Sequence, residues 1–494
     1  MRQNIIQFVN NKKQYPIVTG IASGLYPMLY YYNTNFTYVN SIAQFLFCLL
    51  TFLVIPIVSF YIITQIVNRA NILSKLSKFS LPILNLCWFS LLMLVSSYGI
   101  KRRTLVLLVL MIAATVAILL HKHYKKIVVL QFLMAITVLV TLLPKVLEYA
   151  TVSNKWMRQT DAIESVVFKT KPNIYMIQVD GYANKTELSK APYSFDNSSF
   201  EVALENKGFK WYSNYRSNYY STLSSNTSLF GMRHHYHLKP SKPYQELINS
   251  REVIVGENPV ISIFKNNNYK THLLLEKPYF LVNRPKIAYD FCNISLEDVD
   301  YLGRGFEIKK DIETELNRLL EANNDSGNFY FIEKFLPSHI TNSTDTSKNK
   351  KTERELYLKR LKEANTWLTE LISNIEAKDK NALIIISADH GGFVGFDTTN
   401  ESTVKQDTEA LVKTIFTSAL AIKWNTEAPK FDDAFKTPVN FFRILFAHLS
   451  ENKSYLEHLQ DDKSYIIISK GAPFGVYEYI DENGKVVFNP IKNN

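Results

Sequence analysis

The first 150 residues consist of long apolar stretches with very few charges between them. They contain thirteen Lys or Arg residues and one acid, Glu148, and no formal charge occurs from Gln14 to Asn68. The apolar segments span residues 15–32, 41–67, 79–100, 104–120 and 127–147. Roughly 20 apolar residues cross a bilayer core as a helix, and repeated helices that are apolar on all sides are typical of membrane domains rather than of a buried helical domain. We therefore expect residues 1–150 to form a transmembrane domain of about five helices.

The distribution of Lys and Arg predicts the orientation, because basic residues gather on the cytoplasmic side. With the amino terminus inside, nine fall in cytoplasmic segments: Arg2, Lys12, Lys13, Arg69, Lys75, Lys78, Lys122, Lys125 and Lys126. Four fall outside, namely Lys145 and the Lys101–Arg103 cluster, which runs against the rule. Five spans then place the rest of the chain outside the cytoplasm. Abundant Asn, Lys and Ile indicate an AT-rich bacterial genome, so the expected location is the bacterial inner (cytoplasmic) membrane.

The remaining 344 residues have the charge balance of an ordinary water-exposed domain. They carry 43 basic and 44 acidic residues, so the formal net charge of +11 belongs to the membrane part. They show no clustered basic and aromatic face, which argues against a nucleic-acid partner. Their one cysteine, Cys292, excludes an internal disulfide, and a domain of this size buries enough core without one. We expect a polar linker over 151–170 and one exported domain over 171–494.

Short apolar strands alternate with helical patterns in that domain. The strand candidates are 173–179, 271–275, 328–335, 382–387, 418–423 and 464–468. The helix candidates are 196–207, 258–267, 307–322 and 352–377. This alternation predicts a doubly wound α/β fold, and residues 471–494 predict a terminal β-hairpin around Asp481–Gly484.

Two of the predicted strands end in residues that bind metals. The strand 173–179 is followed by Asp180, and the strand that contains Leu383–Ile386 is followed by Asp389 and His390. Open α/β sheets place their ligands at the carboxyl ends of the strands, and carboxylate and imidazole groups bind divalent metals. Asp180, Asp389 and His390 therefore predict a metal site.

A hydroxyl-rich segment, 217–228, supplies candidates for a nucleophile. Metal-assisted transfer requires a nucleophile beside the metal, and this segment opens a predicted helix, whose amino terminus stabilises anions. On this pattern alone, a polar loop with helix-capping hydroxyls is the favoured alternative. A second segment, Arg233–His237, fits either another metal cluster or a phosphate-binding patch. A surface loop is favoured there, because no carboxylate stands at ligand spacing.

Five short motifs occur in an order that resembles a known family. They are Pro172–Tyr175 with Val179–Tyr182, Ser217–Tyr219 with Thr222 and Ser225, Ser387–Gly391, Thr437–Leu445, and Asp462–Tyr465. Together they resemble the sulfatase-like branch of the alkaline phosphatase superfamily over about residues 171–470. The layout of amino-terminal spans and an exported domain is similar to lipoteichoic acid synthases and lipid A phosphoethanolamine transferases. The resemblance implies an alkaline-phosphatase-like fold for the exported domain.

The resemblance also implies roles for individual residues. Asp180, Asp389 and His390 would bind one divalent metal, with Thr222 as nucleophile and fourth ligand. Thr222 is preferred because it stands three residues before the motif serine, Ser225. We expect zinc first, and manganese or magnesium second, since this mixed ligand set does not select sharply.

His339 fits the family pattern, but a second histidine of that pattern is absent from this sequence. His339 would bind substrate phosphate or protonate a leaving group. The branch usually has another histidine shortly upstream, where this chain has Glu333 and Lys334. Sulfatases also need a Cys/Ser-x-Pro-x-Arg signature, which this sequence lacks, so sulfate-ester hydrolysis is disfavoured.

Three hypotheses of function follow. The favoured one is an integral membrane transferase that moves a phospho-substituent, phosphoethanolamine or phosphoglycerol, from a membrane lipid donor to an envelope glycan acceptor through a phosphothreonine. The second is a phosphodiesterase or other hydrolase that uses water as acceptor, with the same nucleophile and metal. The third is a degenerate, non-enzymatic domain in envelope assembly.

Overall fold

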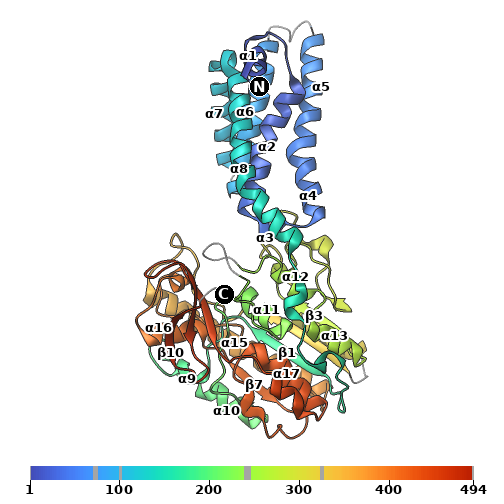
Figure 1. Ribbon diagram of the computed structural model, residues 1–494, viewed down its shortest axis with the longest axis vertical. Helices are drawn as coiled ribbons and strands as arrows, with labels where there is room; N and C mark the ends of the chain where they lie inside the picture. Colours follow the sequence, from blue (N-terminus) through green and yellow to red (C-terminus); the bar gives the residue numbers. More distant parts are fainter. Residues whose placement is uncertain (1, 71–75, 99–102, 239–245, 323–326, 492–494) are drawn as a thin grey trace. The chain divides into compact units, whose positions relative to one another are not determined.

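The computed structural model describes residues 2–70, 76–98, 103–238, 246–322 and 327–491 (Figure 1). The chain divides into two compact units. Unit 1 contains Met1–Val152 with the short segments Val282–Arg284 and Tyr301–Arg304, and unit 2 contains the rest.

Unit 1 is helical. Its helices are α1 (Arg2–Asn10), α2 (Pro16–Thr34), α3 (Phe36–Val39), α4 (Ile42–Leu49), α5 (Ile55–Arg69), α6 (Ser77–Tyr98), α7 (Arg103–Leu119) and α8 (Tyr124–Thr151). Within the described residues, three continuous helical stretches are long and apolar enough to cross a membrane: Ile42–Arg69, Ser77–Tyr98 and His121–Thr151. Helices α2 and α7 occupy the other two segments for which spans are predicted. The count of five spans stays a prediction, and Lys75, Lys101 and Arg102 lie outside the described residues.

Small and amide side chains pack the helices of unit 1 together. A Cβ on Gly24 of α2 would stand 1.6 Å from the carbonyl oxygen of Phe52, so only glycine permits this approach. Asn85 of α6 and Gln131 of α8 exchange buried hydrogen bonds of 2.9 and 3.1 Å. Both features are common where apolar helices associate without help from water.

Unit 2 is built on a seven-stranded mixed sheet. Its strands are β1 (Ile174–Val179), β2 (Phe209–Trp211), β3 (Lys270–Leu275), β4 (Phe291–Cys292), β5 (Asn328–Lys334), β6 (Leu383–Ser387) and β7 (Leu420–Lys423). They pair in the order β2-β7-β6-β1-β5-β3-β4. The five strands from β6 to β4 run parallel, and β7 is antiparallel to both of its neighbours. A separate three-stranded antiparallel sheet contains β8 (Ser464–Ile468), β9 (Gly475–Ile480) and β10 (Val486–Pro490).

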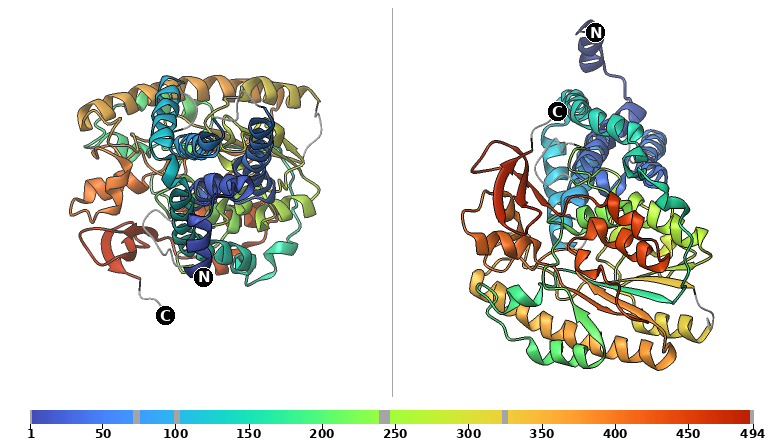
Figure 2. Two further views of the ribbon diagram at one scale, coloured as in Figure 1. Left: turned by 90° about the horizontal axis from the view of Figure 1, so that it is seen from above. Right: turned by 60° about the horizontal axis from the view of Figure 1, so that its bottom comes forward.

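Helices cover both faces of the large sheet, because alternate residues of its strands enter two different cores. In β1, Tyr175, Ile177 and Val179 join one core, and Ile174 and Met176 join the other. The first core includes residues of α10 (Ser198–Asn206), α14 (Ile312–Ala322), α15 (Lys350–Lys378) and α16 (Glu409–Phe416). The second includes residues of α11 (Thr222–Gly231), α12 (Ser250–Val255), α13 (Pro259–Asn266) and α17 (Pro438–Leu449). The long α15 helix runs along one face of the sheet (Figure 2).

The structure confirms the predicted fold class, a helical apolar region followed by a doubly wound α/β domain. Every predicted strand and the terminal hairpin are present. The helix predicted from residue 307 begins only at Ile312, and the segment before it is bound elsewhere: the Lys310 amide donates to the carbonyl of Glu276, just beyond the end of β3. The strand β2 and the helices α12 and α16 are not predicted by the pattern, because each is short and gains its apolar partners only in the packed fold.

Candidate metal centre and nucleophile

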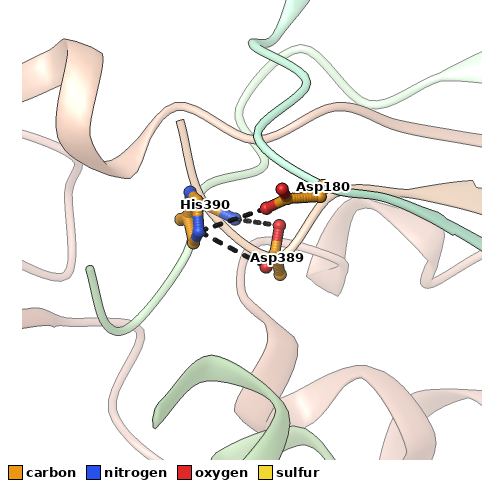
Figure 3. Close-up of side chains that lie close together, drawn as sticks. All are labelled: Asp180, Asp389 and His390. Atoms are coloured by element: carbon orange, nitrogen blue, oxygen red, sulfur yellow. Dashed lines mark hydrogen bonds and ion pairs between the residues drawn. The ribbon is translucent and has the colours of Figure 1, made fainter. Parts of the chain in front are cut away.

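Two parallel strands bring the predicted metal ligands to one edge of the sheet. In the register of β1 with β6, Gln178 is paired with Ser387, and Asp180 and Asp389 each stand two residues beyond this pair. Asp180, Asp389 and His390 each offer a ligand atom, and these atoms lie within 4.8 Å of one another (Figure 3). The Nε2 atom of His390 is 3.4 Å from Asp180 Oδ1 and 3.4 Å from Asp389 Oδ2. All three side chains are buried.

Each of the three side chains offers an atom that could bind a cation. Asp180 Oδ1 and Asp389 Oδ2 are buried and have no hydrogen-bond partner among the described residues. Asp389 Oδ1 accepts from the backbone amides of Gly181 and His390, which fixes the carboxylate. In the neutral ring of His390, the 2.9 Å contact of Nδ1 with the Gly391 carbonyl places the proton on Nδ1, so Nε2 carries the lone pair. Unpaired buried carboxylate oxygens are costly, and one divalent cation would satisfy this donor set.

Two glycines in the motifs allow the chain to come this close. A Cβ on Gly391 would stand 2.1 Å from the Thr414 carbonyl oxygen. Gly181 has φ +67°, and its Cβ would stand 2.9 Å from the backbone of Ser338, next to His339. Because Gly181 and Gly391 have no Cβ, the loops that carry the metal ligands can lie directly against neighbouring backbone.

The charges of the cluster influence one another strongly. Burial raises the pKa of Asp389, and Asp180 raises it further, whereas His390 opposes both. Burial by itself lowers the pKa of His390, but Asp389 and Asp180 more than offset this, so the pKa of His390 is raised. In the protein without metal, His390 thus keeps its proton to a higher pH, and a bound cation would take the place of that proton.

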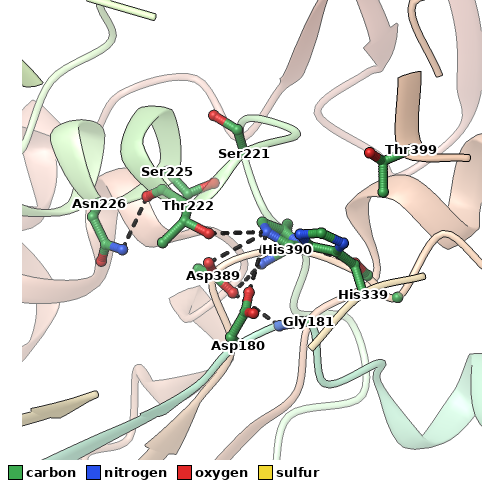
Figure 4. Close-up of polar contacts among 12 residues, drawn as sticks. Asp180, Gly181, Ser221, Thr222, Ser225, Asn226, His339, Asp389, His390 and Thr399 are labelled. Atoms are coloured by element: carbon green, nitrogen blue, oxygen red, sulfur yellow. Dashed lines mark hydrogen bonds and ion pairs between the residues drawn. The ribbon is translucent and has the colours of Figure 1, made fainter. Parts of the chain in front are cut away.

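Thr222 stands at the first position of α11, directly beside the cluster. Its Oγ1 is 3.2 Å from His390 Nε2 (Figure 4). The preceding residue, Ser221, caps the helix, since its side chain accepts from the Ser224 amide. The hydroxyl of Ser225 donates instead to the Tyr219 carbonyl. Ser221 therefore has the capping role that the alternative interpretation gave to this segment. The hydroxyl of Thr222 instead lies beside the metal-ligand cluster, at a helix amino terminus, where anions are stabilised.

His339 lies beside the same cluster. Its ring centroid is 5.7 Å from that of His390, and its Nδ1 contacts the Ile340 carbonyl. Burial lowers the pKa of His339, against the opposing effect of Asp180, so its ring is neutral at pH 7. A pocket of about 180 Å³ is lined by Thr222, His339 and His390 together. The structure thus brings all five predicted site residues together, and their roles stay predictions.

Glu333 does not join the metal-ligand cluster. It is fully buried on β5, and neither carboxylate oxygen has a hydrogen-bond partner among the described residues. Burial, with the nearby Asp180 and Asp389, raises its pKa well above the usual value. The position where the resembled family has a histidine therefore holds a carboxyl group that favours its neutral form.

The surface-loop interpretation of Arg233–His237 is wrong for its central residues. His234 and His235 are each 7% exposed, and burial lowers both pKa values to about 4. His235 Nε2 is 2.9 Å from the Ser224 carbonyl, and its ring stacks on Tyr219 at 4.2 Å. These histidines brace the start of α11. The prediction failed because a run of polar residues usually marks a surface loop, whereas here the polar groups find hydrogen-bond partners inside the fold.

Sequence reasoning missed several residues of the pocket. They are Glu246, Tyr279, Asn342, Phe393, Thr399 and Asn400. They come from separate loops, and no spacing in the sequence marks them as neighbours.

No protein-family model matches the sequence, and neither does any curated protein. Solved structures similar to it include the C-terminal periplasmic domain of EcEptC from Escherichia coli, at 11% identity and a TM-score of 0.43, over 64% of this chain and 96% of that one. A zinc complex of that domain matches at 12% identity, with a TM-score of 0.42, over 64% and 93% of the two chains. The lipoteichoic acid synthase LtaP from Listeria monocytogenes matches at 15% identity, with a TM-score of 0.41, over 66% and 90%.

Removing one ligand of the cluster should remove the metal. The full-length protein in detergent should bind one divalent cation, and Asp389→Ala should reduce the metal content to background, because it leaves only one carboxylate, one imidazole and a neutral hydroxyl to hold the ion. Elemental analysis of the purified proteins measures this. The exposed carboxylate Asp345 provides the control, and Asp345→Ala should keep wild-type content. Equal metal content in Asp389→Ala and the wild type would contradict the assignment.

Metal affinity should fall as the pH is lowered. The raised pKa of His390 means that a proton competes for Nε2 from higher pH than at an ordinary histidine, so affinity is full at high pH and is lost during acidification through that pKa. Calorimetric titration with zinc between about pH 8 and pH 5, around the usual histidine range, would measure it. A pH-independent affinity would show that His390 is not a ligand.

Proposed function

We propose that the protein is a metal-dependent transferase that moves a phospho-substituent from a membrane phospholipid to an envelope glycan through a phosphothreonine. The observation that carries this proposal is the Thr222 hydroxyl, 3.2 Å from His390 Nε2, at the amino terminus of a helix. A nucleophile, a metal-ligand set and a helix dipole that stabilises anions meet at one pocket. This combination suits attack on a phosphate ester.

The metal would be held by Asp180, Asp389, His390 and Thr222. A carboxylate and imidazole set suits zinc first, and manganese or magnesium second. When bound, the ion supplies positive charge to phosphoryl oxygens and lowers the pKa of the Thr222 hydroxyl. The two unpaired carboxylate oxygens of the cluster are the features of this chain that fit it.

The reaction has two balanced steps. In the first, Thr222 Oγ1 attacks the donor phosphorus, and the bond between phosphorus and the diacylglycerol oxygen breaks. The Thr222 proton is released to solvent, and the leaving oxygen takes up a proton from solvent through Nε2 of His339, whose ring is neutral and whose Nδ1 is engaged with the Ile340 carbonyl. In the second, a glycan hydroxyl attacks the phosphothreonine, the bond from phosphorus to Thr222 breaks, and the hydroxyl proton returns to Thr222.

We also propose that unit 2 lies outside the cytoplasm of a bacterial inner membrane, where lipid donor and glycan acceptor are both present. The nine-to-four distribution of basic residues supports this orientation. A reporter that is active only after export, fused after Asn494, should be active. Activity of a cytoplasm-only reporter at the same position would reverse the orientation.

Thr222 should carry the covalent intermediate. We expect purified wild type in lipid nanodiscs to gain a phospho-adduct detectable by intact mass, and Thr222→Ala to gain none. Thr222→Ala should remain folded, because the cap of α11 is Ser221. Ser221→Ala should cost about 1 kcal/mol of stability for the lost cap and should still form an adduct.

The same measurement separates the alternatives. Release of the free phospho-group into water by the wild type, with no transfer to added glycan, would favour a hydrolase. If the wild-type protein contains its metal but gains no phospho-adduct, the result would favour a non-enzymatic domain. An adduct on Thr222→Ala would remove Thr222 from the proposal.

A further inference from the structure

Unit 2 has a second pocket, which shares no lining residue with the pocket at Thr222. Its volume is about 480 Å³. It is lined by residues of α9 (Lys185–Leu188), of α16 and of the turn between β9 and β10. The charged residues in its wall are four bases and two acids, namely Lys190, Arg216, Lys413, Lys436, Glu187 and Glu482. The described wall of this pocket therefore has a net positive charge.

Two of these four cations are paired with acids, and two are not. Lys190 lies 2.9 Å from Glu187, and Lys413 lies 2.7 Å from Glu409. Arg216 and Lys436 form no ion pair with any carboxylate of the described residues. The remaining acid of the wall, Glu482, is exposed on the hairpin turn and pairs with neither of them.

Arg216 is a buried guanidinium with unused hydrogen-bond donors. It is 8% exposed, and its Nη2 donates to the backbone carbonyls of Asp462 and, at 2.8 Å, Asp481. Its Nε is buried without a partner, and its Nη1 forms no hydrogen bond, among the described residues. Gly484, which also lines the pocket, has no side chain to cover this group, since a Cβ there would stand 3.7 Å from Nη1.

The acids near Arg216 do not balance its charge. Burial lowers the pKa of Arg216, and this effect outweighs the opposing attraction of Asp462 and Asp481. The Asp462 carboxylate accepts hydrogen bonds from Thr437 at 2.6 Å and from Asn440 at 3.0 Å, and that of Asp481 accepts from backbone amides of its own turn. A buried charge without a counter-ion is costly. An anion that enters the pocket from solvent would supply the missing negative charge.

The backbone holds the second unpaired cation next to Arg216. The Arg216 amide donates to the Lys436 carbonyl at 2.9 Å, and Arg216 also forms a β-bridge with Thr417, at the end of α16. Lys436 is half-buried. Two adjacent cations, one of them a planar guanidinium, suit the oxygens of a phosphate or a carboxylate.

The rest of the pocket offers neutral polar groups and room for more than an ion. The side chains of Ser213, Asn214 and Asn483 line it and form no hydrogen bond among the described residues. Pockets of roughly 300–1,000 Å³ take small organic ligands, whereas a bare oxyanion would fill only a small part of this one. Hydroxyl and amide groups suit the hydroxyls of a sugar ring.

We propose that this pocket binds an acidic sugar, a sugar residue that carries a phosphate or a carboxylate. The oxyanion is held by Arg216 and Lys436, and the ring hydroxyls by Ser213, Asn214 and Asn483. The inference goes beyond the proposed transfer reaction and does not depend on it, because neither Thr222 nor a ligand of the metal cluster lines this pocket. It gives unit 2 a place to hold an anionic glycan away from the nucleophile.

Ligand-observed NMR titration of the full-length protein in an uncharged detergent tests the proposal. Glucose 1-phosphate and glucuronate should bind saturably, and neutral glucose about tenfold or more weakly, the factor for losing a hydrogen bond between charged groups. Added salt should weaken the binding of the two acids. Equal binding of glucose, or no saturable binding of either acid, overturns the proposal. Inorganic phosphate or glycerol 3-phosphate that binds as tightly as glucose 1-phosphate removes the sugar from it.

Variants assign the binding to this pocket. Lys436→Gln should weaken both acids about fivefold, the upper end for a partly exposed charge pair, without changing the binding of glucose. Arg216→Lys keeps the charge but loses the planar fork, and should weaken the acids about tenfold. Lys380→Gln removes the same charge from an exposed lysine outside the pocket and should bind as the wild type does.

Two controls keep the outcome clear. Thermal melting reports folding, and Lys436→Gln decides if Arg216→Lys fails to fold through the loss of its carbonyl contacts. Wild-type affinity for both acids in folded Lys436→Gln overturns the proposal. Asp389→Ala should bind both acids as the wild type does. Loss of their binding in Asp389→Ala would place the acids at the metal cluster and overturn the second site, whereas absence of any adduct on Thr222 would leave it standing.

Discussion

The site depends on two buried carboxylates that lie close together and have too few hydrogen-bond partners. Asp180 and Asp389 leave adjacent parallel strands at the same sheet edge, and each has an oxygen without a hydrogen bond among the described residues. Like charges buried this closely repel and are poorly solvated. The fold tolerates them because the core on both faces of the sheet fixes the strands, and because His390, or a cation bound beside it, neutralises them.

Several parts of unit 2 serve to hold groups against this cluster. Gly181 lets the loop of His339 approach, and Gly391 lets the strand-end loop pass close to the Thr414 carbonyl. His235 and Tyr219 brace the first turn of α11, whose first residue is Thr222. A nucleophile placed this way loses little freedom when substrate binds, which is how positioning contributes to catalysis.

The charges around the pocket suit a phosphate. The metal ligands and the amino terminus of α11 stabilise an anion, and Glu246 is the one carboxylate among the described lining residues. Glu333 lies outside this arrangement: it is buried on β5, and burial together with Asp180 and Asp389 raises its pKa, which favours a neutral carboxyl. Its neutral form adds no third negative charge to the cluster, so replacement of a histidine at this position is compatible with a metal site.

The sequence by itself determined the features that depend on neighbouring residues. Charge-free apolar runs marked the membrane helices, alternation of short strands and helices marked the α/β domain, and strand-end residues marked Asp180, Asp389 and His390. The family resemblance pointed to Thr222 within the 217–228 segment, but only the tertiary structure shows that its hydroxyl reaches the cluster, because Thr222 and His390 are 168 positions apart and meet through the packing of α11 on the sheet. The same holds for the burial of His234 and His235 and for the place of Glu246 in the pocket. Local periodicity specifies how a segment folds, but contacts between loops distant in sequence form only when the whole sheet and its two helical layers are assembled.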